Sequence, residues 1–209
     1  MKTILFQGDS ITDVGRTKDD RDEYLGSGYA TMVSGMIGRD YPGHYRMRNR
    51  AMSGDRTVDV YARIKKDVIN LEPDVLTVLI GVNDTWHELA WQNGFSIERY
   101  ETLLELMICD VKAARPEIEI VFLEPFCLHG FVTDQFYDDF SSDVFKRQAV
   151  CKKLAEKHGL IFVPLQKMLE DFAEKYPEET LLLDGVHPSY TGHTLIAEAV
   201  YTAMKPILK

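Results

Sequence analysis

The sequence predicts an α/β fold in which helices cover both faces of a parallel sheet. Short apolar runs rich in Val, Ile and Phe recur at 3–6, 75–80, 118–123 and 160–165, with a weaker fifth run at 45–50. Runs of this length and composition are typical of buried parallel strands. Helical patterns separate the runs, and this alternation along the chain indicates strand–helix–strand units.

The helices are expected at 29–37, 58–71, 97–111, 142–158 and 195–203. Apolar residues recur at three- and four-residue spacing in all but the fourth of them. The third is the clearest, because Ser96 is a good N-cap and Arg115–Pro116 ends the pattern. Two long connections, 14–27 and 125–141, follow strand ends, and connections of this length are usually functional or disordered.

Composition limits the class of protein. The chain has 209 residues, with 24 Lys and Arg against 33 Asp and Glu and a net charge of −9. This length suits one domain, which we expect to span 1–209. The negative charge argues against nucleic acid or an anionic membrane surface as the main partner. The expected partner is a small molecule, and a homo-oligomer is left open.

Cysteine usage and the N-terminus indicate the compartment. Cys109, Cys127 and Cys151 are odd in number and widely spaced, which fits neither a disulfide framework nor a zinc motif. The first residues lack the apolar core of 7–15 residues that a signal peptide needs. No apolar run approaches the length of a membrane span. We therefore expect a cytoplasmic protein that does not bind membranes.

Residues suited to acyl transfer follow the predicted strands. Ser10 follows the first strand, Gly54 the second and Asn83 the third, while Asp184 and His187 lie in a loop near the C-terminus. Ligands bind at the carboxyl ends of strands in such sheets. A serine nucleophile needs a histidine base and an acid that orients it. The developing oxyanion needs donors, which the backbone N–H groups of Ser10 and Gly54 and the Asn83 amide can supply.

Four sequence blocks together resemble the GDSL, or SGNH, hydrolase family. They are "GDSITD" at 8–13, "AMSGDRT" at 51–57, "IGVNDTW" at 80–86 and "DGVHPSYTGH" at 184–193. The resemblance implies a flavodoxin-like three-layer α/β/α sandwich with a five-stranded parallel sheet. It also implies a catalytic triad of Ser10, Asp184 and His187, and an oxyanion hole formed by Ser10, Gly54 and Asn83.

Softer features make the chain more similar to bacterial acetylxylan-esterase-like members than to thioesterase or lysophospholipase members. These features are "GSGYA", "NDTW" and "EPF". Gly185 departs from such relatives, which often carry a larger residue between the acid and the base. The expected reaction is removal of short acyl groups, above all acetyl groups, from acetylated saccharides through an acyl-enzyme. A thioesterase or lysophospholipase remains the alternative.

Aromatic and histidine side chains in the loops near the expected mouth of the site are candidates for substrate contacts. Flat aromatic faces suit the apolar faces of sugar rings, although loop aromatics can also serve as lids that pack on the core. The candidates are Trp86, His87, Trp91, Phe126, Phe131, His129 and Tyr137.

Two further classes of function fit parts of the sequence. Asp9, Asp13 and Asp84 could hold a magnesium ion in a metal-dependent phosphoesterase, but Ser10 and His187 would then have no role. A non-catalytic carbohydrate-binding relative is the other class, and the intact serine and histidine argue against it. The esterase interpretation predicts no metal and no cofactor.

Overall fold

The computed structural model describes residues 1–19 and 24–209. Its five strands form one all-parallel sheet in the order β2-β1-β3-β4-β5. The strands are β1 (Lys2–Gly8), β2 (Tyr45–Asn49), β3 (Val75–Leu79), β4 (Glu119–Leu123) and β5 (Ile161–Val163). This is the flavodoxin-like order, in which the chain reverses direction across the sheet between β1 and β3. The predicted α/β fold is confirmed.

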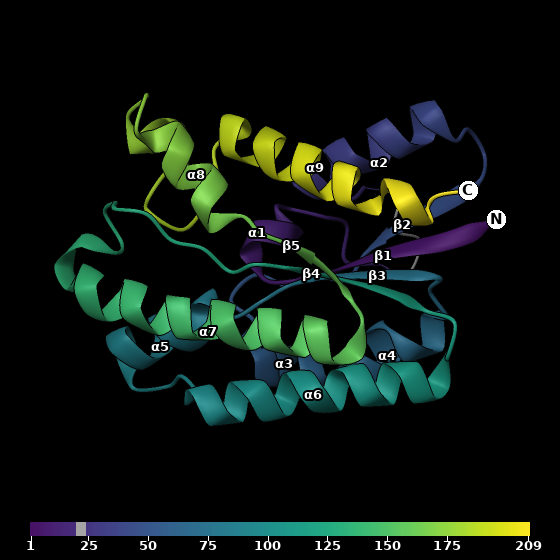
Figure 1. The fold of residues 1–209 in the computed structure, drawn as a ribbon, viewed down its shortest axis with the longest axis horizontal. Helices are drawn as coiled ribbons and strands as arrows, with labels where there is room; N and C mark the ends of the chain where they lie inside the picture. The colour runs from purple at the N-terminus through teal and green to yellow at the C-terminus, as the bar shows by residue number, and fades with distance from the viewer. Residues whose placement is uncertain (20–23) are drawn as a thin grey trace.

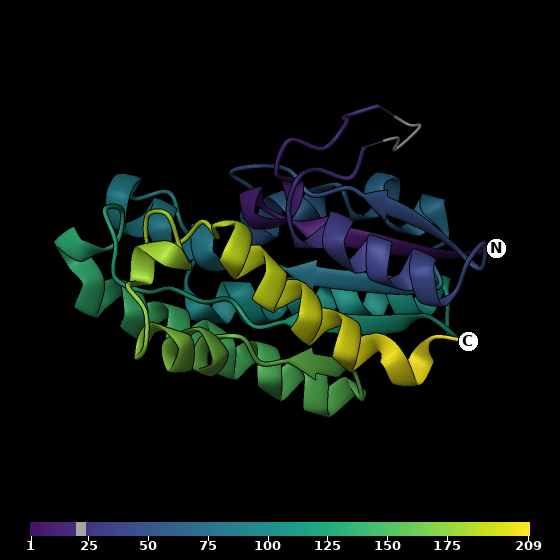
Figure 2. The same ribbon diagram turned by 90° about the horizontal axis from the view of Figure 1, so that it is seen from above.

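Helices lie on both faces of the sheet (Figure 1). One face is covered by α2 (Tyr29–Asp40), α8 (Gln166–Ala173) and α9 (Tyr190–Met204), and Figure 2 shows α2 and α9 side by side. The other face carries α3 (Thr57–Ala62), α4 (Ile64–Asp67), α5 (Val82–Trp91), α6 (Ile97–Ala114) and α7 (Tyr137–His158). The short elements are α1 (Ser10–Asp13), η1 (Ile69–Leu71), η2 (Asp134–Phe136), η3 (Glu178–Thr180) and η4 (Lys205–Ile207).

Two buried apolar clusters hold the three layers together, one on each side of the sheet. Phe6, Val33 and Val200 belong to the cluster beneath α2 and α9. Leu76 and Leu104 belong to the cluster beneath α6. Adjacent residues of a strand point to opposite faces, so each buried strand contributes to both clusters.

The predicted helix at 58–71 is wrong as a single element. The backbone leaves helical geometry at Arg63, with φ −107° and ψ 4°, and the segment divides into α3, α4 and η1. The Arg63 side chain bridges the carboxylates of Asp55 and Asp67. Arg63 is thus tied to Asp55, in the loop that precedes α3. The spacing of apolar residues along the chain gives no sign of these ion pairs.

Two segments expected as loops are helical. Residues 82–91 form α5, and α7 begins at Tyr137, so the connection predicted at 125–141 ends sooner. Asp138 and Asp139 lie in the first turn of α7, where their charges interact favourably with the helix dipole. The predicted connection at 14–27 lacks helices and strands where it is described, and its residues 20–23 lie outside the described part.

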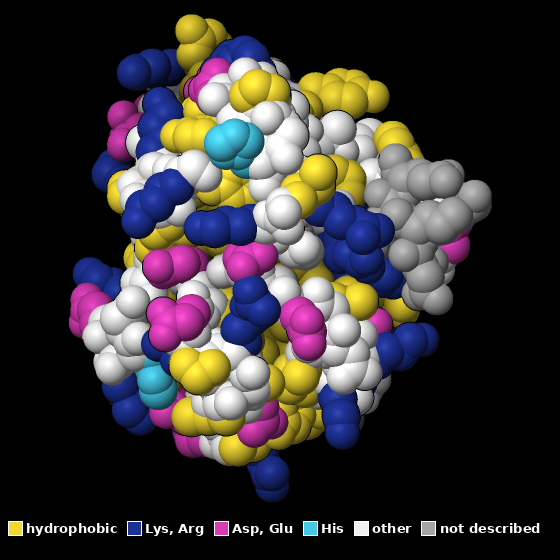
Figure 3. Space-filling model, turned by 90° about the vertical axis from the view of Figure 1, so that its right-hand side faces the viewer, with side chains coloured by type: hydrophobic (Ala, Val, Ile, Leu, Met, Phe, Trp, Pro, Cys, Tyr) yellow, Lys and Arg dark blue, Asp and Glu magenta, His cyan; other side chains and the backbone are white. Residues whose placement is uncertain are grey.

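The amino ends of the strands form the opposite end of the molecule from the sequence blocks described above. Figure 3 shows this end, where basic and acidic side chains alternate and neither sign forms a continuous patch. No helix in the described residues combines the length and the apolar character that a membrane span needs.

Candidate active site

Ser10 occupies a sharp turn between the first strand and a short helix. It is the first residue of α1 and follows directly after β1 and Asp9. Asp9 is the N-cap of α1, and its Oδ1 accepts a hydrogen bond of 3.0 Å from the backbone N–H of Ile11. This cap fixes the turn, so the Ser10 hydroxyl is held at the carboxyl end of the sheet.

A chain of hydrogen bonds connects Ser10, His187 and Asp184. The Ser10 Oγ lies 2.9 Å from His187 Nε2, and His187 Nδ1 lies 2.7 Å from Asp184 Oδ2. The other carboxylate oxygen of Asp184 accepts bonds from the backbone N–H groups of Val186 and His187, at 2.9 and 2.8 Å. Because an ionised carboxylate only accepts, Nδ1 carries the proton and Nε2 is free to accept the serine proton.

The electrostatics of the pair favour a proton on the imidazole when one becomes available. Burial raises the pKa of Asp184, but hydrogen bonds from His187 and Val186 outweigh it and leave the pKa below its ordinary value. The hydrogen bond to Asp184 raises the pKa of His187, against the opposing effect of burial. Asp9 adds to this rise through its charge. An imidazolium formed during a reaction is therefore stabilised.

Three hydrogen-bond donors are available for an oxyanion: one at the start of α1, one on the loop before α3 and one in the first turn of α5. Among the described residues, the backbone N–H groups of Ser10 and Gly54 have no protein acceptor. Asn83 is 3% exposed, and its Nδ2 donates one hydrogen to the Asp55 carbonyl at 3.0 Å. An amide nitrogen carries two hydrogens, so the second remains for a substrate. The bond to Asp55 also connects the first turn of α5 to the loop that carries Gly54.

The backbone conformation of Gly54 explains why a glycine occupies this position. Its φ is +84°, which L side chains rarely adopt, and a Cβ built there would meet no atom within 4 Å. Space, then, does not select glycine here; the left-handed conformation does. Gly54 itself is exposed on this loop.

Buried carboxylates secure the loop that carries Gly54. Asp13 Oδ2 accepts hydrogen bonds from the Ser53 N–H and hydroxyl, both at 2.9 Å. Asp84 Oδ2 accepts from the Thr57 N–H and hydroxyl, both at 3.0 Å. Both carboxylates therefore have structural partners. Among the described residues no group of three His, Cys, Asp or Glu side chains is arranged so that it could hold a metal ion.

The base of α5, which carries Asn83, is anchored to α7. The buried Arg147 donates from Nε to the Thr85 hydroxyl at 2.8 Å, and that hydroxyl donates to Asp143 Oδ2 at 2.6 Å. Arg147 also donates to the Phe95 carbonyl beyond the end of α5 at 2.7 Å. These contacts fix both ends of the helix. The sequence analysis did not select Arg147, because an Arg in a helical pattern ordinarily indicates an exposed face.

The loop that carries Asp184 packs against the segment after β4. The backbone N–H groups of Leu128 and Val132 donate to the carbonyls of Gly185 and Asp184, at 3.0 and 2.9 Å. Gly185 has φ +96°, and a Cβ there would lie 2.4 Å from the Thr133 hydroxyl. A larger residue at 185, common in the relatives that the sequence resembles, is thus excluded by this packing. Sequence reasoning missed the supporting segment 128–133, whose role depends on backbone contacts.

Trp86, His87 and Trp91 form an aromatic cluster beside His187. All three lie on α5, a helix rather than the expected loop. The Trp86 ring meets the His187 ring edge to face, with centroids 5.9 Å apart. Trp91 stacks on Trp86 at 6.3 Å and meets His87 at 4.9 Å. Of these three candidates Trp86 therefore adjoins His187, and Trp91 and His87 extend the cluster away from it.

The other candidates lie elsewhere. Phe126 is fully buried in the apolar core, so its ring offers no exposed face to a substrate and the prediction that it contacts substrate is wrong. His129 is exposed and contacts Tyr137 and Asp134 of its own region. Phe131 is 92% exposed in the segment that supports the Asp184 loop. No contact of these three rings with Ser10 or His187 occurs among the described residues.

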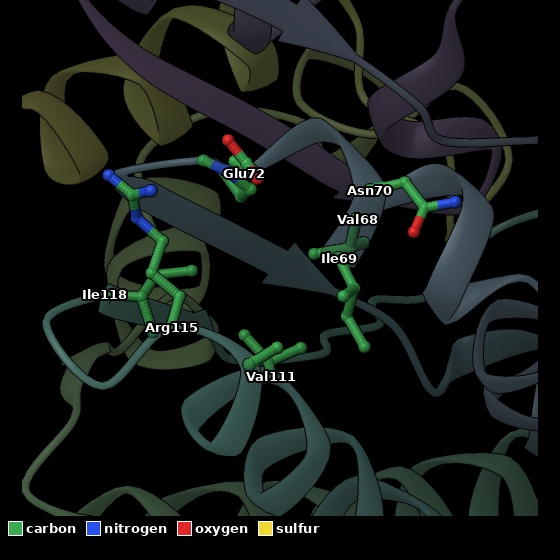
Figure 4. A pocket seen from close by; sticks show the side chains of 9 residues that line it. Val68, Ile69, Asn70, Glu72, Val111, Arg115 and Ile118 are labelled. Atoms are coloured by element: carbon green, nitrogen blue, oxygen red, sulfur yellow. The ribbon is translucent and has the colours of Figure 1, made fainter.

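A separate pocket of about 300 Å³ lies at the amino ends of the strands (Figure 4). It lies between the turn with Ile69 and Asn70 and the end of α6 with Val111 and Arg115. No serine or histidine lines it. Arg115, on the wall of the pocket, is paired with Asp74 at 2.5 Å. Without a serine or a histidine, the pocket lacks the residues that acyl transfer requires.

Comparison with known proteins agrees with this geometry. The model of the GDSL-like lipase/acylhydrolase family matches residues 6–195. The chain belongs to this family. The matched range includes every residue of the Ser10 and His187 region described above. Family membership and the relatives below make the chain a carboxylic ester hydrolase.

Several relatives are similar over nearly their whole length. An acetylxylan esterase of Geobacillus stearothermophilus is 31% identical over 94% of this chain and 90% of its own. The crystal structure of Axe2, an acetylxylan esterase from the same organism, superposes with a TM-score of 0.86 and 29% identity, covering 97% of this chain and 94% of that one. A GDSL-like protein of Parabacteroides merdae has a TM-score of 0.92 and 32% identity, covering 100% and 96%.

Proposed function

We propose that this enzyme is a serine esterase that removes acetyl groups from acetylated saccharides through a covalent acyl-enzyme. One observation carries the proposal: Ser10, His187 and Asp184 form a continuous chain of hydrogen bonds of 2.9 and 2.7 Å. In this assignment Ser10 is the nucleophile, His187 the general base and Asp184 the residue that orients the imidazole.

In the first half-reaction the Ser10 Oγ attacks the ester carbonyl carbon while His187 Nε2 takes the hydroxyl proton. The carbonyl oxygen becomes an oxyanion, stabilised by the N–H groups of Ser10 and Gly54 and the free hydrogen of the Asn83 amide. The C–O bond to the alcohol then breaks, and His187 returns the proton to the leaving oxygen. Ser10 keeps the acyl group as an ester.

In the second half-reaction water replaces the alcohol. His187 takes a proton from water as the oxygen attacks the acyl carbon, and the same donors stabilise the second oxyanion. Breaking the bond to Ser10 Oγ releases acetate, and His187 returns the proton to the serine. Because the pKa of His187 is raised, the imidazolium that forms in each half-reaction is stabilised.

The relatives and the surroundings of His187 support a short acyl group on a saccharide. The 31% identical relative is named an acetylxylan esterase. The exposed Trp91 and half-buried Trp86 offer apolar faces beside the base. The free thiols of Cys127 and Cys151 suit a reducing compartment, so we infer a cytoplasmic enzyme that acts on small acetylated oligosaccharides.

The Ser10→Ala variant tests the assignment. It should fold normally and lose nearly all esterase activity, while an organophosphonate should label Ser10 in the wild type. The matched control is Ser34→Ala on α2, whose hydroxyl bonds the Ala30 carbonyl away from the site. Substantial activity in Ser10→Ala would show that the nucleophile is misassigned.

A series of acyl chain lengths tests the substrate. Acetyl esters should exceed butyryl and octanoyl esters in kcat/KM, and peracetylated xylobiose should release acetate. A preference for octanoyl esters or palmitoyl thioesters would contradict the acetyl assignment and favour a thioesterase or lysophospholipase. EDTA should leave activity unchanged; loss restored by magnesium would contradict the serine mechanism.

A further inference from the structure

The position of the leaving alcohol follows from the chemistry of His187. The same Nε2 that takes the Ser10 proton must deliver it to the leaving oxygen, so that oxygen comes within hydrogen-bond reach of Nε2. Groups that adjoin the His187 ring are therefore placed to contact the alcohol part of the ester. Trp86 adjoins this ring edge to face, with the ring centroids 5.9 Å apart.

The aromatic surface continues outward from Trp86. Trp91 stacks on it with an interplanar angle of 19° and centroids 6.3 Å apart, and the Trp91 side chain is 62% exposed. The two indoles thus form a path from the base to solvent. Trp86 and Trp91 together form an aromatic platform.

The platform is held in place and carries no charge of its own. Beyond the end of α5, Asn93 accepts hydrogen bonds from Arg56 through its carbonyl at 2.7 Å and its side chain at 2.9 Å. Burial, aided by the charge of Arg56, lowers the pKa of His87, the third ring of the cluster, and so favours its neutral form. A fixed, uncharged aromatic surface suits the apolar face of a neutral ring rather than an anionic group.

We propose that the aromatic platform is the subsite for the alcohol part of the ester and binds a pyranose ring of the saccharide. This inference rests on the proposed function, because it assigns the alcohol side of that same site. The alcohol subsite also predicts acyl transfer to a sugar. The leaving alcohol vacates the platform, and a free sugar can then bind there and react with the acyl-enzyme in place of water.

The intercepting step is the reverse of acylation with a new alcohol. The sugar hydroxyl oxygen attacks the acyl carbon of the Ser10 ester while His187 takes the hydroxyl proton. The bond from the acyl carbon to Ser10 Oγ breaks, and His187 returns the proton to the serine. The products are an acetylated sugar and free enzyme, with no other reactant.

Partitioning of the acyl-enzyme tests the platform. With p-nitrophenyl acetate as donor, the ratio of acetylated acceptor to acetate is measured with xylobiose and, separately, with ethanol, which has no ring face. Water and alcohol use the same acyl-enzyme and the same base, so a disturbance of His187 lowers both rates and leaves the ratio unchanged. The variants are Trp91→Ala and Trp86→Phe, with Phe145→Ala on α7, 43% exposed, as the control.

We expect Trp91→Ala to lower the xylobiose ratio about fivefold, in line with the loss of one aromatic face, and to lower the ethanol ratio much less. Trp86→Phe should lower the xylobiose ratio in part, and Phe145→Ala should not change it. Equal xylobiose ratios in wild type and Trp91→Ala would overturn the platform, as would a wild type that hydrolyses the donor but never acetylates xylobiose. Failure of the proposed function is distinct: Ser10 would then not be acylated by the donor at all.

Discussion

Replacing Asp9 with Asn should change how stability depends on pH. Asp9 is 0% exposed, its Oδ2 has no partner among the described residues, and burial raises its pKa from 3.8 to about 7. Repulsion from Asp55 and Asp84 adds to the rise, while the Ile11 hydrogen bond and the charge of His187 oppose it. Between pH 3.8 and about pH 7, Asp9 is therefore mostly protonated in the folded chain and mostly ionised in the unfolded chain.

The sign of the effect is set by that bound proton. Where the folded state binds more protons, the free energy of unfolding falls as pH rises, so Asp9 reduces stability progressively from about pH 4 to pH 7. The interval between 3.8 and about 7 corresponds to about 4 kcal/mol. Asn keeps the acceptor for the Ile11 N–H and cannot ionise. The stability of Asp9→Asn relative to wild type should therefore rise by about 4 kcal/mol from pH 4 to pH 8.

Urea denaturation at half-unit steps from pH 4 to pH 8 measures this difference. Asp13→Asn is the control. Burial raises the pKa of Asp13, but Lys18 and Ser53 outweigh it and leave the pKa below 3.8. The stability that ionised Asp13 contributes is therefore lost only below that pH, and this variant should lose a nearly constant amount of stability from pH 4 to pH 8. A flat difference for Asp9→Asn across the range would refute the reasoning, because it would mean that Asp9 ionises alike in the folded and unfolded chains.

The remaining predictions concern the reaction and one turn. Asn83→Ala should lower kcat by roughly 10²–10³ with a smaller change in KM, since the amide acts on charge that develops in the transition state; steady-state kinetics that show a change in KM alone would contradict this. The raised pKa of His187 should place the acid limb of the kcat/KM profile above pH 6.5, and Asp9→Asn should move that limb to lower pH by removing a nearby carboxylate. Gly185→Ala should lower the free energy of unfolding by about 2 kcal/mol in urea denaturation, because Gly185 has a positive φ and a Cβ there would meet the Thr133 hydroxyl. Adding Thr133→Ala should restore only the part of this loss that the contact with the hydroxyl causes.

The sequence predicted the contacts of Ser10, His187 and Asp184, but not how the aromatic side chains are directed. Ser10, Gly54 and Asn83 follow three neighbouring strands, and the carboxyl ends of parallel strands share one edge, so strand order along the chain places all three at that edge. Phe126 also follows a strand, yet its ring turns into the core. Position after a strand does not determine side-chain direction, which depends on the local backbone and on what packs above it.

The helices were predicted well where one face is strongly apolar and poorly where polar contacts define them. The pattern at 97–111 matches α6, whose buried face is continuous. In α5 the buried residues are confined to the first turns, Val82 to Thr85, so the apolar repeat is too short to distinguish a helix from a loop. Arg63 divides the next pattern through ion pairs with residues on either side, a tertiary effect that apolar spacing does not record.

Helix α5 joins two tasks in one rigid body. Its first turn holds the Asn83 amide, its next turn holds Trp86, and Arg147 fixes it to α7 through Thr85. A tilt of α5 that made room for a bulkier alcohol would move the Asn83 amide away from the oxyanion. A change of specificity achieved by moving this helix would therefore lower the rate of the reaction. Divergence of substrate range in this protein, natural or engineered, should therefore proceed by exchanging side chains on a stationary helix, with the positions of Trp86, His87 and Trp91 free to vary while those of Asn83 and Thr85 stay constant.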